Sequence, residues 1–162
     1  MNYLNIDEFQ ELAKTSCPDL GHISDNLRHM RYGIFTEVGE IVDIFKKNLA
    51  YKKEIDTVHL GEEIGDCMWY IVNHETFLGS KIFPKFYKPE FDINFMMKCS
   101  VENEQVLLAG CLIQLANKFN LNFEELLFKN IEKLRIRFPE GFSEERALNR
   151  DLNKERESLE GC

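Results

Sequence analysis

Hydrophobic residues along most of the chain recur every three or four positions, the spacing that places them on one face of an α-helix. The pattern breaks over residues 79–99, where glycine and proline interrupt it and lysines alternate with aromatic residues. We expect an ordered segment there whose aromatic residues close the core or a subunit interface. We prefer this interpretation to the alternative, a site that binds a strand of nucleic acid. The predicted helices span residues 6–13, about 26–49, about 57–78, about 101–119 and about 123–137.

This pattern predicts an all-α fold, a helical bundle around a four-helix core. Helix-capping residues support the boundaries: Ser24-Asp25 before the first long helix, Asp56 or Thr57 before the second, and Ser143 before a last polar helix. The 162 residues are enough for one domain with a sizeable core and too few for two. We therefore expect residues 1–162 to form a single domain with its core over about 26–151.

A short phrase of acid, apolar residue, glycine and acid occurs twice, as Glu37-Val38-Gly39-Glu40 and as Glu63-Ile64-Gly65-Asp66. Residues three positions apart lie on one side of a helix, so each phrase presents two carboxylates together. Both pairs have the same angular offset from the hydrophobic face of their own helix. When these two faces pack together, the four acids are expected to converge on a cation, because like charges repel at short range.

An oxygen-only cluster of this kind suits Mg²⁺, with Mn²⁺ as an alternative, and is not typical of zinc. Gly39 and Gly65 lie at the other border of each hydrophobic face, where we expect the missing side chain to let another helix approach. Glycine inside a helix costs roughly 1 kcal/mol relative to alanine, so its presence in the same slot of both phrases carries weight.

Charge and cysteine content narrow the classes of partner. The 28 acidic residues exceed the 20 basic ones and give a net charge of −8, which disfavours a broad grip on nucleic acid or anionic lipid. Five scattered cysteines without a C-x-x-C indicate neither a disulfide framework nor a thiolate zinc site. The first residues lack the basic start and long apolar run typical of a secretion signal, and no run of about 18 apolar residues occurs, so we expect neither secretion nor membrane spanning. We expect a cytoplasmic protein with neither nucleic acid nor membrane as a partner.

Three stretches of the chain resemble the MazG-like all-α nucleoside triphosphate pyrophosphohydrolases. They are EVGEIVD at residues 37–43, LGEEIGDCMWY at 60–70 and NIEKLRIRFPEGFS at 130–143. The family pattern is similar to E-E-x-x-E followed by E-x-x-D, with acids that bind magnesium. The chain departs from it at Thr36, which stands where the family has the first acid of the doubled pair.

The resemblance and the residue types together assign metal and water-activating roles. Glu37 is expected to orient or deprotonate the attacking water, and Glu62 and Asp43 either support the ligands or are ordinary surface acids. The predicted catalytic residues are Glu37, Glu40 and Lys133, and the predicted metal ligands are Glu37, Glu40, Glu63 and Asp66.

Basic residues of the third stretch are candidates for phosphate binding. Lys133 and Arg137 lie one turn apart on one helix face, preceded by Asn130, and Arg150 is a weaker candidate of the same kind. Trp69, the only tryptophan, projects beyond Asp66 on the helical phase, so we expect it to stack on a base or to pack at a dimer seam.

The resemblance implies hydrolysis of a nucleoside or deoxynucleoside triphosphate to the monophosphate and pyrophosphate by a homodimer or homotetramer. One alternative is a base-restricted relative that acts on dUTP or dCTP, or a phosphoribosyl-ATP pyrophosphatase. The other is a catalytically inactive nucleotide-binding or sensing protein that keeps the metal seam, for which Thr36 is the hint in the sequence.

Overall fold

The computed structural model describes residues 3–86, 88, 90–149 and 151–160, and their regular structure is helical throughout. The all-α prediction is therefore confirmed for this part of the chain. The elements are α1 (Ile6–Ala13), a short 3-10 helix η1 (Lys14–Ser16), α2 (Ile23–Tyr51), α3 (Thr57–Phe77), α4 (Ile93–Glu102), α5 (Gln105–Lys118), α6 (Phe123–Arg137), α7 (Glu144–Leu148) and α8 (Leu152–Glu160).

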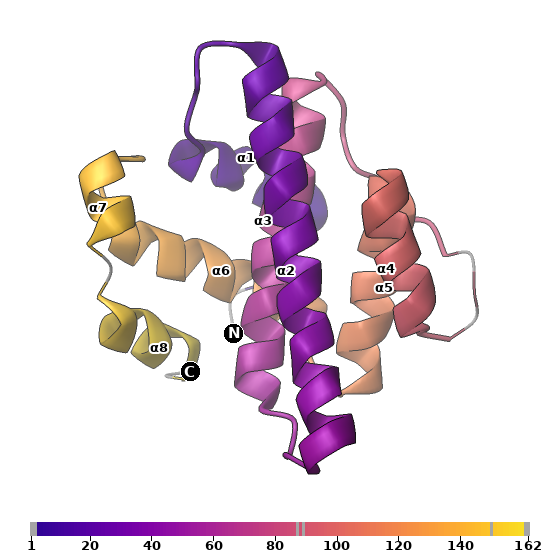
Figure 1. Ribbon diagram of the computed structural model, residues 1–162. Coiled ribbons are helices and arrows are strands. Elements are labelled where there is room, and N and C mark those ends of the chain that lie inside the picture. The colour runs from indigo at the N-terminus through magenta and orange to yellow at the C-terminus, as the bar shows by residue number, and fades with distance from the viewer. Residues whose placement is uncertain (1–2, 87, 89, 150, 161–162) are drawn as a thin grey trace.

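The two longest helices, α2 and α3, form an antiparallel hairpin at the centre of the molecule (Figure 1). α4 and α5 lie on one side of this hairpin, and α6, α7 and α8 lie on the other. α3 packs against α1, α2, α5, α6 and α8, so it is the helix around which the others are arranged. Its apolar residues Leu60, Ile64, Met68 and Ile71 are fully buried, as expected for a helix that is surrounded by others.

Side-chain caps define several of these helices. The Asp56 carboxylate accepts from the backbone N–H groups of Val58 and His59, as predicted, and the Ser143 hydroxyl accepts from Arg146. The predicted cap at Ser24-Asp25 is wrong, because α2 begins at Ile23. The turn before α2 is held by Asn26 instead, because its Oδ1 accepts from Leu20 N–H at 2.8 Å. The helix then starts before the expected cap.

The predicted helix over 101–119 corresponds to α5, which begins later, at Gln105; residues 101 and 102 belong to α4, a separate helix that was not predicted and that ends before Asn103. Asn103 has a φ of 63°, a left-handed conformation that ends α4. The irregular segment expected over 79–99 is correspondingly shorter, because Asp92 caps α4 by accepting from two backbone N–H groups. Within it, Phe91 packs against Phe45 with ring centroids 6.1 Å apart, as predicted for the aromatics, whereas Phe83 and Phe86 are exposed.

Glycines mark several close approaches between elements, and the sequence analysis placed one of them correctly. A Cβ on Gly65 would lie 3.1 Å from the Asn130 side chain of α6, so the expected approach of another helix occurs there. At Gly39 the expectation is wrong, because among the described residues no atom of another element lies within 4 Å of such a Cβ. Gly110 of α5 has the tightest contact, since a Cβ there would lie 2.0 Å from the Lys85 carbonyl oxygen.

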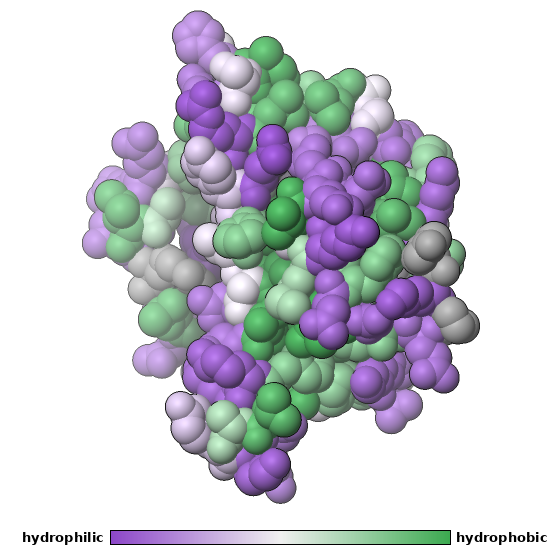
Figure 2. Space-filling view, turned by 45° about the vertical axis from the view of Figure 1, so that its right-hand side comes forward, coloured by the Kyte–Doolittle hydropathy of each residue, from purple (hydrophilic) through white to green (hydrophobic). Residues whose placement is uncertain are grey.

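The surface mixes polar and apolar side chains. Figure 2 shows green hydrophobic residues interspersed with purple ones on the face that brings α4 and α5 forward. Phe35 and Leu49 of α2 are exposed, because α3 and α4 cover only part of that helix. In the described ranges, no helix has the length and hydropathy to cross a membrane.

The glycine contacts predict opposite effects of two matched substitutions. Gly110→Ala forces α5 away from a backbone carbonyl, and we expect the free energy of unfolding to fall by about 1–3 kcal/mol. Gly39→Ala adds a methyl group to an open helix surface, and we expect it to rise by up to about 1 kcal/mol. Urea unfolding followed by circular dichroism measures both, and equal effects of the two changes would contradict the packing described.

Candidate metal and phosphate site

Three carboxylates from the two central helices meet at the seam between α2 and α3. Oxygen atoms of Glu37, Glu63 and Asp66 all lie within 4.8 Å of one another. The Glu37 and Glu63 carboxyl groups are close enough to share a proton, and such a shared proton raises the pKa of Glu63. Glu40 is exposed and lies outside this group, because its position on α2 is rotated further toward solvent than that of Glu37.

The carboxyl groups of this cluster repel one another and are partly buried. Burial, the hydrogen bond to Glu37 and the charges of Glu37 and Asp66 together raise the pKa of Glu63 to about 9. Burial is also the main cause that raises the pKa of Glu37, and the charge of Asp66 adds to it. Only 8% of Glu63 is exposed, so water screens this repulsion weakly.

Asp66 is held by two side chains of α6. Lys133 Nζ donates to both oxygens of Asp66, at 2.7 and 2.6 Å, and to Glu62 Oε1 at 3.1 Å. Asn130 Nδ2 donates to Asp66 Oδ1 at 2.6 Å. Burial by itself would lower the pKa of Lys133, but the charges of Asp66 and Glu62 outweigh burial and raise it.

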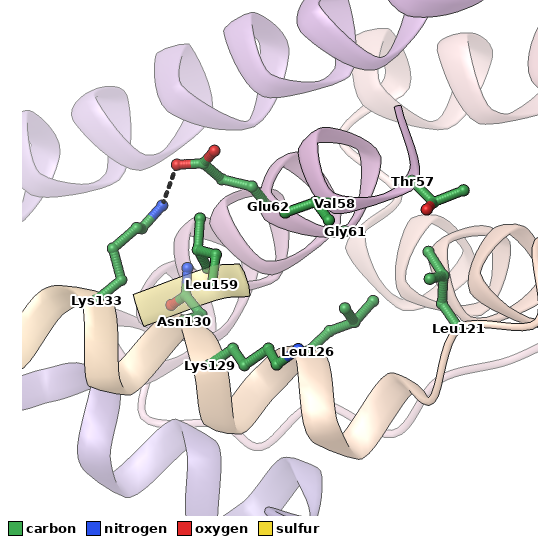
Figure 3. A pocket seen from close by; sticks show the side chains of 10 residues that line it. All are labelled: Thr57, Val58, Gly61, Glu62, Leu121, Leu126, Lys129, Asn130, Lys133 and Leu159. Carbon is green, nitrogen blue, oxygen red and sulfur yellow. Dashed lines mark hydrogen bonds and ion pairs between the residues drawn. The ribbon is translucent and has the colours of Figure 1, made fainter. Parts of the chain in front are cut away.

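Lys133 is fully buried, and a buried charge is costly unless it is paired. The carboxylates of Asp66 and Glu62 therefore stabilise its charged form. Figure 3 shows it reaching from α6 to Glu62 of α3, and it lines a small cavity of about 80 Å³ together with Asn130 and Leu159. The Asn130 Oδ1 atom is buried and has no hydrogen-bond partner among the described residues. The predicted phosphate-binding residues Lys133 and Asn130 are thus placed beside the acids, where they orient Asp66.

A second group of possible ligands lies one turn earlier on α3. His59, Glu62 and Glu63 bring ligand atoms within 4.8 Å of one another, and His59 Nδ1 lies 3.2 Å from Glu63 Oε1. Glu63 therefore belongs to both groups, and Glu62, assigned as a supporting acid, lies next to the seam. Asp43, the other supporting candidate, forms ion pairs with Lys46 and Lys47 on its own helix and is not in either group.

A cavity of about 340 Å³ opens next to the acids. Glu37 and Asp66 form one part of its wall and Arg137 another, so negative and positive groups face the same space. The remaining wall is largely aromatic, which suits a planar ring. Its lining residues are Ser16, Pro18, His29, Glu37, Asp66, Trp69, Tyr70, Leu134, Arg137, Phe138, Phe142 and Ala147.

Trp69 lies in the wall of this cavity, whereas its helical phase alone placed it outside the buried face of α3. It is 8% exposed, its Nε1 donates to Ser16 Oγ at 3.0 Å, and its ring meets Tyr70 edge-on with centroids 4.9 Å apart. α1 packs over this side of α3, and Ser16 of η1 covers the position. The tryptophan is therefore held rigidly where it borders the cavity.

Arg137 borders the cavity from the end of α6. Its Nε donates to Glu155 Oε1 at 2.8 Å and its Nη2 to Glu155 Oε2, a two-pronged pair with α8. The guanidinium also lies over the Phe138 ring, 5.8 Å from its centroid. Arg150, the weaker candidate for phosphate contact, lies outside the described residues.

Several residues of this site were not selected from the sequence. Tyr70 follows Trp69 directly, and Phe138 and Phe142 flank the turn that ends α6, so aromatic residues next to a motif were the available signal. His29 gave none, because a single histidine on a helix has no distinctive spacing. Burial lowers the pKa of His29, and its Nδ1 is buried without a hydrogen-bond partner among the described residues.

The donor set of the seam fits a hard divalent cation. Carboxylate oxygens from Glu37, Glu63 and Asp66 are the ligands that Mg²⁺ and Mn²⁺ prefer. Burial above all, with the neighbouring charges of Glu37 and Asp66, raises the pKa of Glu63, so a bound cation would favour the charged form of this carboxylate.

Comparison with known proteins gave no matching family model, no similar curated protein and no similar solved structure.

Glu63 makes stability depend on pH when no metal is present. Folded Glu63 keeps its proton up to about pH 9, whereas in the unfolded chain it loses it near its ordinary pKa of 4.5. The folded state binds more protons between these values, so we expect the free energy of unfolding to fall as pH rises across this range.

Glu63→Gln removes this dependence, and at pH 8 with chelator we expect the variant to be more stable than the wild type by roughly 1–3 kcal/mol. Urea unfolding at pH 5 and pH 8 measures the difference. The exposed Glu54→Gln is the matched control and should keep the wild-type pH profile. A Glu63→Gln chain with the wild-type slope would contradict the protonated pair.

Proposed function

We propose that the protein hydrolyses nucleoside or deoxynucleoside triphosphates between the α and β phosphates, giving the monophosphate and pyrophosphate with the help of Mg²⁺. The observation that carries the proposal is the three-carboxylate seam at the edge of a cavity that also contains an arginine and an aromatic wall. The three stretches that resemble MazG-like pyrophosphohydrolases contribute to this one region, which supports the same reading.

Divalent cations supply charge neutralisation for the phosphates and a lowered pKa for water at such sites. Glu37, Glu63 and Asp66 are the residues that would hold them, with Glu40 close by on α2. Glu37 borders the cavity and carries a raised pKa, so one of its carboxylate oxygens is suited to accept the proton of the attacking water.

The α6 residues would keep the acids in place during this reaction. Lys133 and Asn130 fix both oxygens of Asp66, so this carboxylate cannot rotate away when substrate enters. Arg137 is the positive group that borders the cavity itself, and it is suited to bind the phosphate oxygens that the cations leave uncovered. The ring faces of Trp69, Tyr70 and Phe142 provide surfaces for a nucleobase.

A nucleotide-binding protein without turnover is the second candidate, and Thr36 is the observation that favours it. Its hydroxyl donates to the Gly33 carbonyl oxygen at 2.9 Å, and it lines a separate groove with Arg31 and Tyr32. The position at which the resembled family has an acid therefore faces away from the seam in this chain.

An assay with each triphosphate and Mg²⁺ separates the two candidates. The proposal expects pyrophosphate and monophosphate in equal amounts, and a side-by-side panel of ribo- and deoxyribonucleotides reveals any base restriction. Release of single phosphate would overturn the proposed cleavage between the α and β phosphates, and nucleotide binding without any product would favour the second candidate.

Removing charge at the seam should abolish turnover without unfolding the chain. We expect Asp66→Asn and Glu37→Gln each to lower kcat/KM by about a thousandfold or more, since both act on the charge that develops in the transition state. Asp43→Asn on the same helix as Glu37 is the control and should stay within about twofold, as expected for a surface ion pair. Pyrophosphate release at saturating Mg²⁺ measures all three.

Mg²⁺ should stabilise the wild-type chain, because it neutralises the like charges of Glu37, Glu63 and Asp66. We expect the Tm to rise with Mg²⁺ concentration in the wild type and in Asp43→Asn, as linkage requires of a ligand bound by the folded state. Glu63→Gln should lose most of the rise. An equal rise in all three proteins would place the cation elsewhere.

A further inference from the structure

The C-terminal helix α8 contributes to the cavity through a residue that does not itself line it. Glu155 of α8 is 3% exposed and receives two hydrogen bonds from Arg137, whose side chain is also largely buried. Glu155 lies 18 positions from Arg137 in the chain and on a helix that is otherwise mostly polar. A buried acid on such a helix has a specific partner, and here Arg137 is one.

The geometry of this pair determines which part of Arg137 remains for a ligand. Glu155 engages Nε and Nη2, the side edge of the guanidinium. Among the contacts of the described residues, none uses Nη1 of Arg137. The central carbon of the guanidinium also lies over the Phe138 ring, 5.8 Å from its centroid, which adds a second contact that limits where the side chain can move. Nη1 is then the nitrogen of the guanidinium that Glu155 leaves for a ligand in the cavity that Arg137 lines.

α8 is itself tied to the helix that carries the acids. Arg156 donates to Asp56, the N-cap residue of α3, at 3.1 Å. Leu159 packs between α3 and α6, where Figure 3 shows it in the same small cavity as Asn130 and Lys133. Direct contacts therefore hold α8 against both α3 and α6.

Arg137 would have other partners without Glu155. Glu37 and Asp66 line the same cavity, and a free guanidinium on a long side chain is attracted to such a pair of acids. An arginine bound to the seam would neutralise the charge that a divalent cation needs and would withdraw from the substrate. Glu155 opposes this because it offers a buried, two-pronged partner on the other side of Arg137.

We propose that Glu155 is a positioning residue for Arg137, which it holds away from the carboxylate seam so that Nη1 binds a phosphate oxygen of the triphosphate. This inference rests on the proposed function for its substrate. It makes α8 part of the functional site, although Glu155 itself would not touch the ligand and acts through Arg137.

The kinetic test compares Glu155→Gln, Glu155→Asp and Arg137→Ala with the wild type in Mg²⁺. We expect Glu155→Gln to raise KM for the triphosphate about tenfold with a smaller change in kcat, as for loss of a charge-assisted contact in binding. Glu155→Asp keeps the carboxylate and should recover part of the affinity. Glu157→Gln, an exposed acid on the same helix, is the control and should match the wild type.

A double-mutant cycle separates positioning from a structural role. If Glu155 acts through Arg137, Glu155→Gln adds little to KM once Arg137→Ala is present. If Glu155 only stabilises α8, its effect on KM and on Tm adds in full to that of Arg137→Ala. An additive cycle, or an unchanged KM in a folded Glu155→Gln chain, would overturn the inference.

Calorimetric binding of inorganic tripolyphosphate with Mg²⁺ gives a readout that does not need turnover. Hydrolysis absent in the wild type, with tripolyphosphate bound and weakened about tenfold by Glu155→Gln, would refute the proposed hydrolase function and support the positioning role. Tripolyphosphate binding that is equal in wild type, Glu155→Gln and Arg137→Ala, or absent from the wild type, would overturn the positioning role whether or not hydrolysis is seen.

Discussion

The repulsion among Glu37, Glu63 and Asp66 is the constraint on which the rest of the structure depends. Packing the apolar faces of α2 and α3 brings these carboxylates together in a weakly screened seam, where each charge destabilises the others. The protein responds in two ways, by keeping a proton between Glu37 and Glu63 and by placing Lys133 against Asp66. Neither response removes the electrostatic repulsion completely, so binding of a cation at the seam would be favourable.

The arrangement of α6 and α8 follows from that constraint. A fully buried lysine is tolerated only because Asp66 and Glu62 accept its hydrogen bonds, so α6 must cross α3 at this level. Gly65 permits the crossing, since any side chain there would meet Asn130. One turn further along α6, Arg137 requires its own buried acid, and α8 supplies it. Lys133 and Arg137 are thus each matched to a carboxylate from a different helix.

Stability and chemistry are linked through the same side chains. A half-buried group of like charges reduces the stability of the metal-free chain, yet it is the arrangement that the proposed function requires. The aromatic wall formed by Trp69, Tyr70 and Phe142 is built from residues that pack within the fold and also border the cavity. Structural packing and the candidate ligand surface are therefore not separable here.

Much of the local structure was determined by the sequence itself. The hydrophobic period and the caps at Asp56 and Ser143 specify helices, because these depend on neighbours within one turn. The two acidic phrases have the same angular position relative to the hydrophobic face of their helices. This common phase predicted that Glu37, Glu63 and Asp66 lie together where the two faces meet. The break at Asn103 was missed because asparagine can enter the left-handed conformation without any distinctive pattern around it.

Only the tertiary structure decided which distant side chains complete the site. The helical phase alone could not tell that Glu40 stays in solvent, or that Trp69 is covered, because both depend on how neighbouring helices cross. Nor could it pair Arg137 with Glu155, since a carboxylate on a polar helix looks like any surface acid until burial singles it out. The periodicity of hydrophobic residues can be read from the sequence, whereas the way in which helices cross depends on the packing of the whole molecule.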